Sequence, residues 1–279
     1  MQMRTLSSRK NEVESDSHCM SIELLGLRLD ALTEKQTCDH ILDSLERGEG
    51  GTLITANLDY LRRSCCDDEF GRFVKQSDLI VADGMPLIWA SRLQGTPLPE
   101  RVAGSSLCLS LSGELATKHR TVYLLGGNPG VAHQAAGILQ DRYPGLEIAG
   151  TYCPQVGFEQ DPEVLELIRQ NIIDAQPNVL FVALGSPKTE KLIEMLRKDL
   201  PLAWWIGVGI SLSFITGEVQ RAPHWMQVSG TEWIHRLCQE QKRLGKRYLV
   251  DGIPFAMKLL TSSLLKRIRS SLLRQPNQE

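Results

Sequence analysis

Short apolar runs alternate with longer amphipathic stretches along most of the chain. Five runs are rich in β-branched or aromatic residues and have the length of a buried strand: Thr52–Thr55, Leu79–Ala82, Val122–Leu125, Val179–Leu184 and Trp204–Val208. Apolar residues at helical spacing predict helices over Thr33–Arg47, Leu58–Gln76, Gly104–Lys118, Gly130–Tyr143, Pro162–Ala175 and Thr189–Asp199. Strands buried on both faces and separated by helices predict a parallel sheet in an α/β layer fold.

Composition divides the chain into three parts. Residues 1–20 are polar and charged and predict a disordered tail, while residues 21–220 carry the strand and helix pattern of an α/β core. Residues 221–279 have no strand pattern and predict a helical appendage with 11 Lys plus Arg against four Asp plus Glu. The net charge of -2 therefore conceals an acidic core at -9 and a basic appendage at +7.

The basic appendage predicts amphipathic helices. On a helix, Arg236, Arg243 and Arg247 share one face beside an apolar stripe, and a second stripe comprises Met257, Leu260, Leu264, Ile268 and Leu272. Basic amphipathic helices with aromatic neighbours are typical of proteins that bind an anionic membrane surface. The alternative is an ordinary docking helix with a solvated charged face. Nucleic acid is a poorer partner, because the acidic core would repel it.

The remaining composition limits the compartment. Hydrophobic residues make up 42% of the chain, which excludes a disordered protein, and no uninterrupted apolar run reaches the length of a membrane-spanning helix. Seven cysteines at scattered spacings predict reduced thiols rather than a disulfide framework or a zinc site. The polar N-terminus does not resemble a signal peptide. We therefore expect a cytoplasmic protein, peripheral on the cytoplasmic face of the plasma membrane.

Polar side chains follow two of the predicted strands. Thr55 ends the first strand and Asn57 follows it, and Asp83 with Gly84 comes after the second. In parallel α/β sheets, ligands bind beyond the carboxyl ends of the strands. A partly buried carboxylate at such a place could act as a general base. The competing interpretation for both Asn57 and Asp83 is helix capping.

Further candidates are basic residues and glycine turns. Arg101 precedes a predicted helix, Gly126 and Gly127 follow the third strand, and Lys188 follows the fourth. These groups are suited to anions and phosphates, but a complete G-x-G-x-x-G is missing, so support for dinucleotide binding is weak. No P-loop, G-x-S-x-G, H-E-x-x-H or D-x-D motif occurs. A departing diphosphate would therefore need cationic side chains in place of a metal.

Taken in order along the chain, these motifs resemble the WecG/TagA/CpsF family of bacterial glycosyltransferases. The resemblance covers about residues 21–255. It rests on Thr55-x-Asn57, Ala82-Asp83-Gly84, Arg101-Val102-x-Gly104, Leu125-Gly126-Gly127, Gly185-x-Pro187-Lys188-x-Glu190, Arg221-Ala222-Pro223 and Gly230-x-Glu232-Trp233-x-x-Arg236-Leu237. Each motif is weak alone, whereas the ordered set is specific.

The resemblance implies a Rossmann-like core and an inverting transfer, without metal or cofactor, from a UDP-sugar donor to an undecaprenyl-diphosphate-linked sugar. The donor sugar would be of the N-acetylmannosamine, uronic acid or glucose type. Asp83 matches the family's proposed base, and Thr55, Asn57 and Arg101 match pocket residues. The appendage's cations would contact the diphosphates: Arg236, Arg243, Lys246 and Arg247. Arg221 would offset charge on the departing UDP.

Two positions depart from the family pattern, which often has Gln at the position of Thr189 and Asp at that of Ser106. We expect both to face the pocket and to alter sugar specificity. Two alternatives remain open from the residues: an NAD(P)-dependent oxidoreductase, suggested by the glycine turns, and a non-catalytic, membrane-docked sugar-nucleotide sensor. An exposed apolar face could also favour a homo-oligomer.

Overall fold

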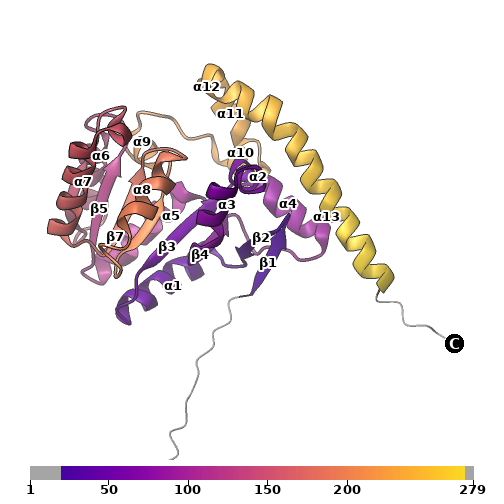
Figure 1. The fold of residues 1–279 in the computed structure, drawn as a ribbon, viewed down its shortest axis with the longest axis horizontal. Coiled ribbons are helices and arrows are strands. Elements are labelled where there is room, and N and C mark those ends of the chain that lie inside the picture. The colour runs from indigo at the N-terminus through magenta and orange to yellow at the C-terminus, as the bar shows by residue number, and fades with distance from the viewer. Residues whose placement is uncertain (1–19, 274–279) are drawn as a thin grey trace, which may run out of the picture.

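The structure is a computed structural model that describes residues 20–273, except for the side chain of Arg243. Its centre is a six-stranded parallel sheet (Figure 1). The strand order is β4 (Leu79–Ala82), β3 (Gly51–Ala56), β8 (Trp204–Gly207), β7 (Val179–Ala183), β5 (Thr121–Gly126) and β6 (Glu147–Tyr152). The predicted α/β class and all five predicted strands are confirmed.

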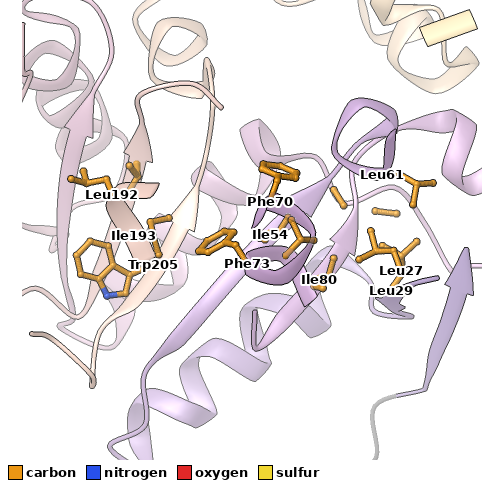
Figure 2. Close-up of a cluster of buried hydrophobic side chains, with 14 of the residues drawn as sticks. Leu27, Leu29, Ile54, Leu61, Phe70, Phe73, Ile80, Leu192, Ile193 and Trp205 are labelled. Carbon is orange, nitrogen blue, oxygen red and sulfur yellow. The ribbon is translucent and has the colours of Figure 1, made fainter. Parts of the chain in front are cut away.

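The sheet is buried because neighbouring residues of each strand pack into opposite layers. In β3, Leu53 packs into one hydrophobic cluster and Ile54 into the other. Figure 2 shows the cluster that contains Ile54. The layer containing Ile54 holds α2 (Leu58–Cys66), α3 (Asp68–Lys75), α4 (Met85–Gln94), α7 (Pro162–Ala175) and α8 (Lys188–Leu196). The layer containing Leu53 holds α1 (Glu34–Glu46), α5 (Gly104–Thr117), α6 (Val131–Arg142) and α9 (Ser211–Thr216).

Three strands have no counterpart in the predicted set. The edge strand β6 is half exposed and carries few apolar residues, so its pattern is weak. Gly150 is required in it, because a Cβ there would lie 2.5 Å from the Tyr123 ring. The other two form an antiparallel hairpin, β1 (Ser21–Leu24) and β2 (Leu27–Asp30).

The predicted single helix over Leu58–Gln76 is wrong. The chain breaks at Asp67, which is extended at φ -132° and ψ 106°. Its carboxylate accepts a hydrogen bond of 3.0 Å from the backbone N–H of Phe70, which caps α3 as a separate helix. Helix α4 is also additional, and it starts two residues after Asp83.

Within the described part of the chain, the segment after Arg221 contains helices and short loops but no strand. The helices are α10 (His224–Ser229), α11 (Glu232–Gln239), α12 (Gln241–Gly245), a π-helical segment at Lys246–Gly252 and α13 (Ile253–Leu273). Helix α13 lies along α4 (Figure 1) and adds its buried residues to the layer that contains Ile54. Among the described residues, no helix is long and apolar enough to cross a membrane.

The predicted apolar stripe on α13 is not the face that packs on the core. Phe255, Leu259 and Ser263 are buried and make that contact. The stripe residues Met257, Leu264, Ile268 and Leu272 are exposed instead, and Leu260 is only partly buried. The helix therefore docks by one face and presents a second apolar face to the surroundings.

Candidate functional site

A cavity of about 840 Å³ opens at the carboxyl edge of the sheet. The loops after β3, β4, β5, β7 and β8 form its floor, and α11, the π-helical segment and the first turn of α13 close one side. Nine of the expected site residues line it: Thr55, Asn57, Asp83, Arg101, Gly127, Lys188, Thr189, Arg236 and Arg247. Parallel strands bring together the residues that follow them, and the appendage adds Arg236 and Arg247.

Asp83 lies half-buried at the end of β4. Its Oδ2 accepts a hydrogen bond of 3.3 Å from the backbone N–H of Gly104, the first residue of α5, and α4 has no side-chain cap. Burial raises the pKa of Asp83, whereas the charges of Arg101 and Arg236 and the Gly104 hydrogen bond lower it. Such an environment suits a group that accepts a proton.

Thr55 and Asn57 flank this carboxylate from β3 and α2. Asn57 caps α2, because its Oδ1 accepts from the N–H groups of Asp59 at 3.0 Å and Tyr60 at 3.2 Å. The prediction that Asn57 caps a helix is therefore correct for its side-chain oxygen. The NH₂ group of the same side chain is left to bind a ligand. Gly104 lets α5 approach Thr55, since a Cβ on Gly104 would lie 3.0 Å from Thr55 Oγ1.

The glycine turn after β5 contributes one residue to the cavity. Gly126 packs instead against β7, where a Cβ would lie 2.6 Å from the carbonyl oxygen of Ala183. Gly127 lines the cavity, and its N–H donates to the same carbonyl at 2.9 Å. Lys188 also lines the cavity, with its Nζ 2.6 Å from a carboxylate oxygen of Glu159.

Thr189 is a buried wall residue at the start of α8. It is 3% exposed, and its Oγ1 has no hydrogen-bond partner among the described residues. Next to it, Glu190 is buried and accepts a hydrogen bond from the Tyr60 hydroxyl. Burial and the neighbouring carboxylate raise the pKa of Tyr60, which holds the phenol in its neutral form. Glu190 thus holds Tyr60, a residue of the cavity wall, through this hydrogen bond.

Two ion pairs join the appendage to the core at the cavity. Arg101 Nη1 lies 2.9 Å from Glu232 Oε2 of α11, and both side chains are largely buried. Arg247 Nε lies 3.2 Å from Asp59 Oδ2 of α2, whose other oxygen pairs with Arg62 at 2.9 Å. These pairs place cations of the appendage and core around one opening, where an anionic ligand would be stabilised.

A further cation near the cavity is Arg236, which lies on α11. Its guanidinium carbon lies 6.0 Å from the centre of the Phe214 ring, and its Nη2 lies 3.9 Å from Glu240 Oε1. The Arg236 charge lowers the pKa of Asp83, so the two groups influence each other electrostatically.

The sequence matches the WecG/TagA/CpsF glycosyl transferase family over residues 22–269. The chain belongs to this family. It is similar to an N-acetylglucosaminyldiphosphoundecaprenol N-acetyl-beta-D-mannosaminyltransferase of Bacillus subtilis strain 168, with 32% identity over 67% of this chain and 71% of the relative. A protein of that name from Staphylococcus aureus strain MW2 shows 28% identity over 88% of this chain and 94% of the relative. The chain is thus a glycosyltransferase, which favours transfer chemistry over the oxidoreductase alternative.

Three residues expected at this glycosyltransferase site do not line the cavity: Gly126, Arg221 and Lys246. The side chain of Arg243, also expected there, is not among those that the structure describes. Arg221 Nη2 donates to Ser106 Oγ at 2.9 Å, so Ser106 holds Arg221 rather than facing the pocket. The expectation that Ser106 lines the pocket is wrong, because the first turn of α5 directs it toward the start of the appendage.

Other lining residues of this family member were not among the expected site residues. Asp59, Arg62 and Glu232 carry charge, while Met85 and Trp89 add apolar surface. Glu232 belongs to the motif Gly230-x-Glu232-Trp233, so the sequence could have indicated it as a site residue. Its ion pair with Arg101 could not be predicted from the sequence. Within residues 20–273, no group of three or more His, Cys, Asp and Glu side chains is arranged to hold a metal ion.

Proposed function

We propose that this glycosyltransferase moves a sugar from a UDP donor to a polyprenyl-diphosphate-linked sugar, with inversion and without a metal. The named relatives act on an undecaprenyl-diphosphate-linked N-acetylglucosamine and transfer N-acetylmannosamine. The observation that carries the proposal is Asp83 beside Arg101 and Arg236 on the wall of the cavity. One site then offers a proton acceptor and cations for a diphosphate.

Asp83 would act as the general base. The acceptor hydroxyl oxygen attacks the anomeric carbon of the donor, and its proton passes to the Asp83 carboxylate. The bond between that carbon and the β-phosphate oxygen breaks, and UDP leaves with the electron pair. Arg236 and Arg247 would stabilise the charge that develops on the diphosphate, as preorganised cations do in water-poor sites. Thr55, Asn57 and Lys188 would contact the substrates.

Thr189 would influence the choice of donor sugar. Its hydroxyl oxygen is buried on the cavity wall without a protein partner among the residues described, so a substrate hydroxyl or amide could bond to it. Sites built to hydrogen-bond a substrate group discriminate strongly against analogues that lack the group. The donor is best identified by offering a panel of UDP-sugars with a short-chain lipid-diphosphate-sugar acceptor and detecting products by mass spectrometry.

The appendage would hold the enzyme at an anionic membrane surface as a peripheral protein. The exposed apolar face of α13 lies beside Lys258 and Arg269, which is the arrangement of interfacial helices. A lipid-linked acceptor resides in a membrane, so docking there would present the cavity to it.

The role of Asp83 is tested by Asp83→Asn. Removal of a general base is expected to reduce kcat by about 100- to 10,000-fold. Donor binding measured by calorimetry should persist, because the amide oxygen can still accept from Gly104. Asp174→Asn is the matched control, since Asp174 is an exposed residue of α7 outside the cavity.

Full turnover in Asp83→Asn would contradict the assignment of the base. A wild-type protein that binds UDP-sugars but transfers none, over the whole donor panel, would support the sugar-nucleotide sensor instead.

A further inference from the structure

The cavity has two chemically different ends. One end carries the charged groups around Asp83. The other is apolar and is lined by Met85, Trp89, Trp233, Tyr248, Ile253 and Ala256. A nucleotide sugar can stack its base on an aromatic ring, whereas the aliphatic side chains of Met85, Ile253 and Ala256 suit a ligand with a hydrocarbon segment.

The apolar end begins directly beside the candidate base. Helix α4 starts two residues after Asp83, and Met85 and Trp89, four residues apart, lie on one face of it. Gly230 packs against this face, because a Cβ there would lie 2.6 Å from Met85 Cγ and 2.9 Å from Trp89 Cζ2. The first two turns of α4 thus form one wall, which leads away from Asp83.

The appendage contributes further apolar side chains to this end. The rings of Trp233 and Tyr248 pack edge to face with centroids 6.2 Å apart. Trp89 is 41%, Trp233 37% and Ile253 45% exposed. Large apolar side chains that remain exposed at the mouth of a cavity are typical of binding surfaces.

This apolar surface continues out of the cavity along α13. Ile253 lines the cavity and is also the first residue of the exposed face that carries Met257, Leu264 and Ile268. Spacings of four, seven and four residues keep these side chains on one side of the helix. A hydrocarbon chain longer than the cavity can therefore leave it over apolar surface.

The charges fit the same ligand. Arg247 belongs to both ends of the cavity, since its guanidinium carbon lies 6.0 Å from the Tyr248 ring centre while its Nε faces Asp59. Arg236 lies on the same helix as Trp233. An amphiphile with an anionic head and an apolar tail would contact the cations with its head and the aromatic side chains with its tail.

We propose that the apolar end of the cavity, between the first two turns of α4 and the start of α13, binds the prenyl units next to the diphosphate of the lipid-linked acceptor. The inference rests on the proposed function, because it assigns a subsite to that acceptor. Trp89 and Ile253 would determine the preference for a prenylated substrate.

The test compares two acceptors that share sugar and diphosphate but carry either a farnesyl chain or a methyl group, in solution without vesicles. For Trp89→Ala and for Ile253→Ser, the ratio of kcat/KM for the farnesyl acceptor to that for the methyl acceptor should fall about tenfold, which corresponds to about 1.4 kcal/mol. Each preparation is its own folding control, because both acceptors meet the same protein. Trp225→Ala, an exposed tryptophan outside the cavity, should leave the ratio unchanged.

An unchanged ratio in both cavity variants would overturn the proposal. Binding provides a second measurement that does not depend on catalysis: by calorimetry, the wild type should bind farnesyl diphosphate more tightly than methyl diphosphate, and Trp89→Ala should lose this difference. If the wild type transfers no sugar to either acceptor, the proposed function fails while the binding measurement still decides on the subsite. Equal affinity of the wild type for the two diphosphates would exclude the subsite.

Discussion

At the scale of single residues, the charge on Asp83 depends on neighbours from three segments. Burial raises its pKa most, Arg101 and Arg236 lower it, and Glu232 raises it. Glu232 also pairs with Arg101 at 2.9 Å, so the appendage shares the cation that lies next to the candidate base. The ionisation of Asp83 is therefore linked to the position of α11.

Glu232→Gln is expected to move the acid limb of the kcat/KM profile to lower pH. The variant removes a negative charge that raises the pKa of Asp83 and leaves Arg101 free to lower it further. A base with a lower pKa stays ionised, and hence active, to lower pH. The pH dependence of kcat/KM measures the shift, with Glu166→Gln on α7 as the control. A limb that stays in place or moves to higher pH would show that Glu232 does not act on the base.

At the scale of elements, single polar side chains decide where helices begin. The pattern of apolar residues alone continues from α2 into α3, and only the cap at Asp67 separates them. The separation matters for the site, because α2 carries Asn57 at its N-terminus and Asp59 in its first turn. Helix α3 places Phe70 and Phe73 in the hydrophobic cluster that also contains Leu192 and Ile193 of α8 (Figure 2).

Asp67→Ala should lower the free energy of unfolding by about 1 kcal/mol, because the N–H of Phe70 loses its capping acceptor. Asp67→Asn should restore stability to within a few tenths of a kcal/mol, since asparagine caps as well as aspartate. Urea denaturation followed by circular dichroism measures both. Equal destabilisation by the two variants would mean that the charge, not the cap, is what matters at this position.

At the scale of the whole molecule, the appendage closes one side of the cavity and carries the surface that we propose for membrane docking. It pairs with the core through Glu232 and Arg247 and packs on α4 through Phe255 and Leu259. The opposite side of α13 is exposed, and we propose that it contacts the membrane surface. The separation of charge along the chain, acidic before residue 221 and basic after it, coincides with the change from the α/β core to the helical appendage.

Removal of two cations beside the exposed face of α13, Lys258→Gln with Arg269→Gln, should weaken binding to anionic vesicles by about 30-fold. Each cation near such a surface is worth about 1 kcal/mol, and tenfold in affinity corresponds to about 1.4 kcal/mol. Sedimentation with vesicles measures the partition. The control, Lys35→Gln with Lys118→Gln, changes the net charge equally but acts on α1 and on the C-terminal cap of α5. The same loss in both double variants would point to net charge rather than to docking by α13.

The sequence by itself determined five of the six strands of the parallel sheet, most helices and the strand-end residues Thr55, Asn57 and Asp83. These follow from local periodicity and from the rule that parallel strands end at one edge. Strand β6 could not be predicted in this way, because its own residues show little apolar pattern and it forms by pairing with β5.

Only the tertiary structure decided which charges meet and which face of α13 packs. Glu232 and Arg101 are 131 residues apart, and nothing local relates them. Arg221 has the same charge as Arg236, yet it bonds to Ser106 outside the cavity. α13 has apolar residues on two faces, so periodicity could not choose between them. The packing of α13 on α4 buries Phe255 and Leu259 and thereby leaves the other face exposed.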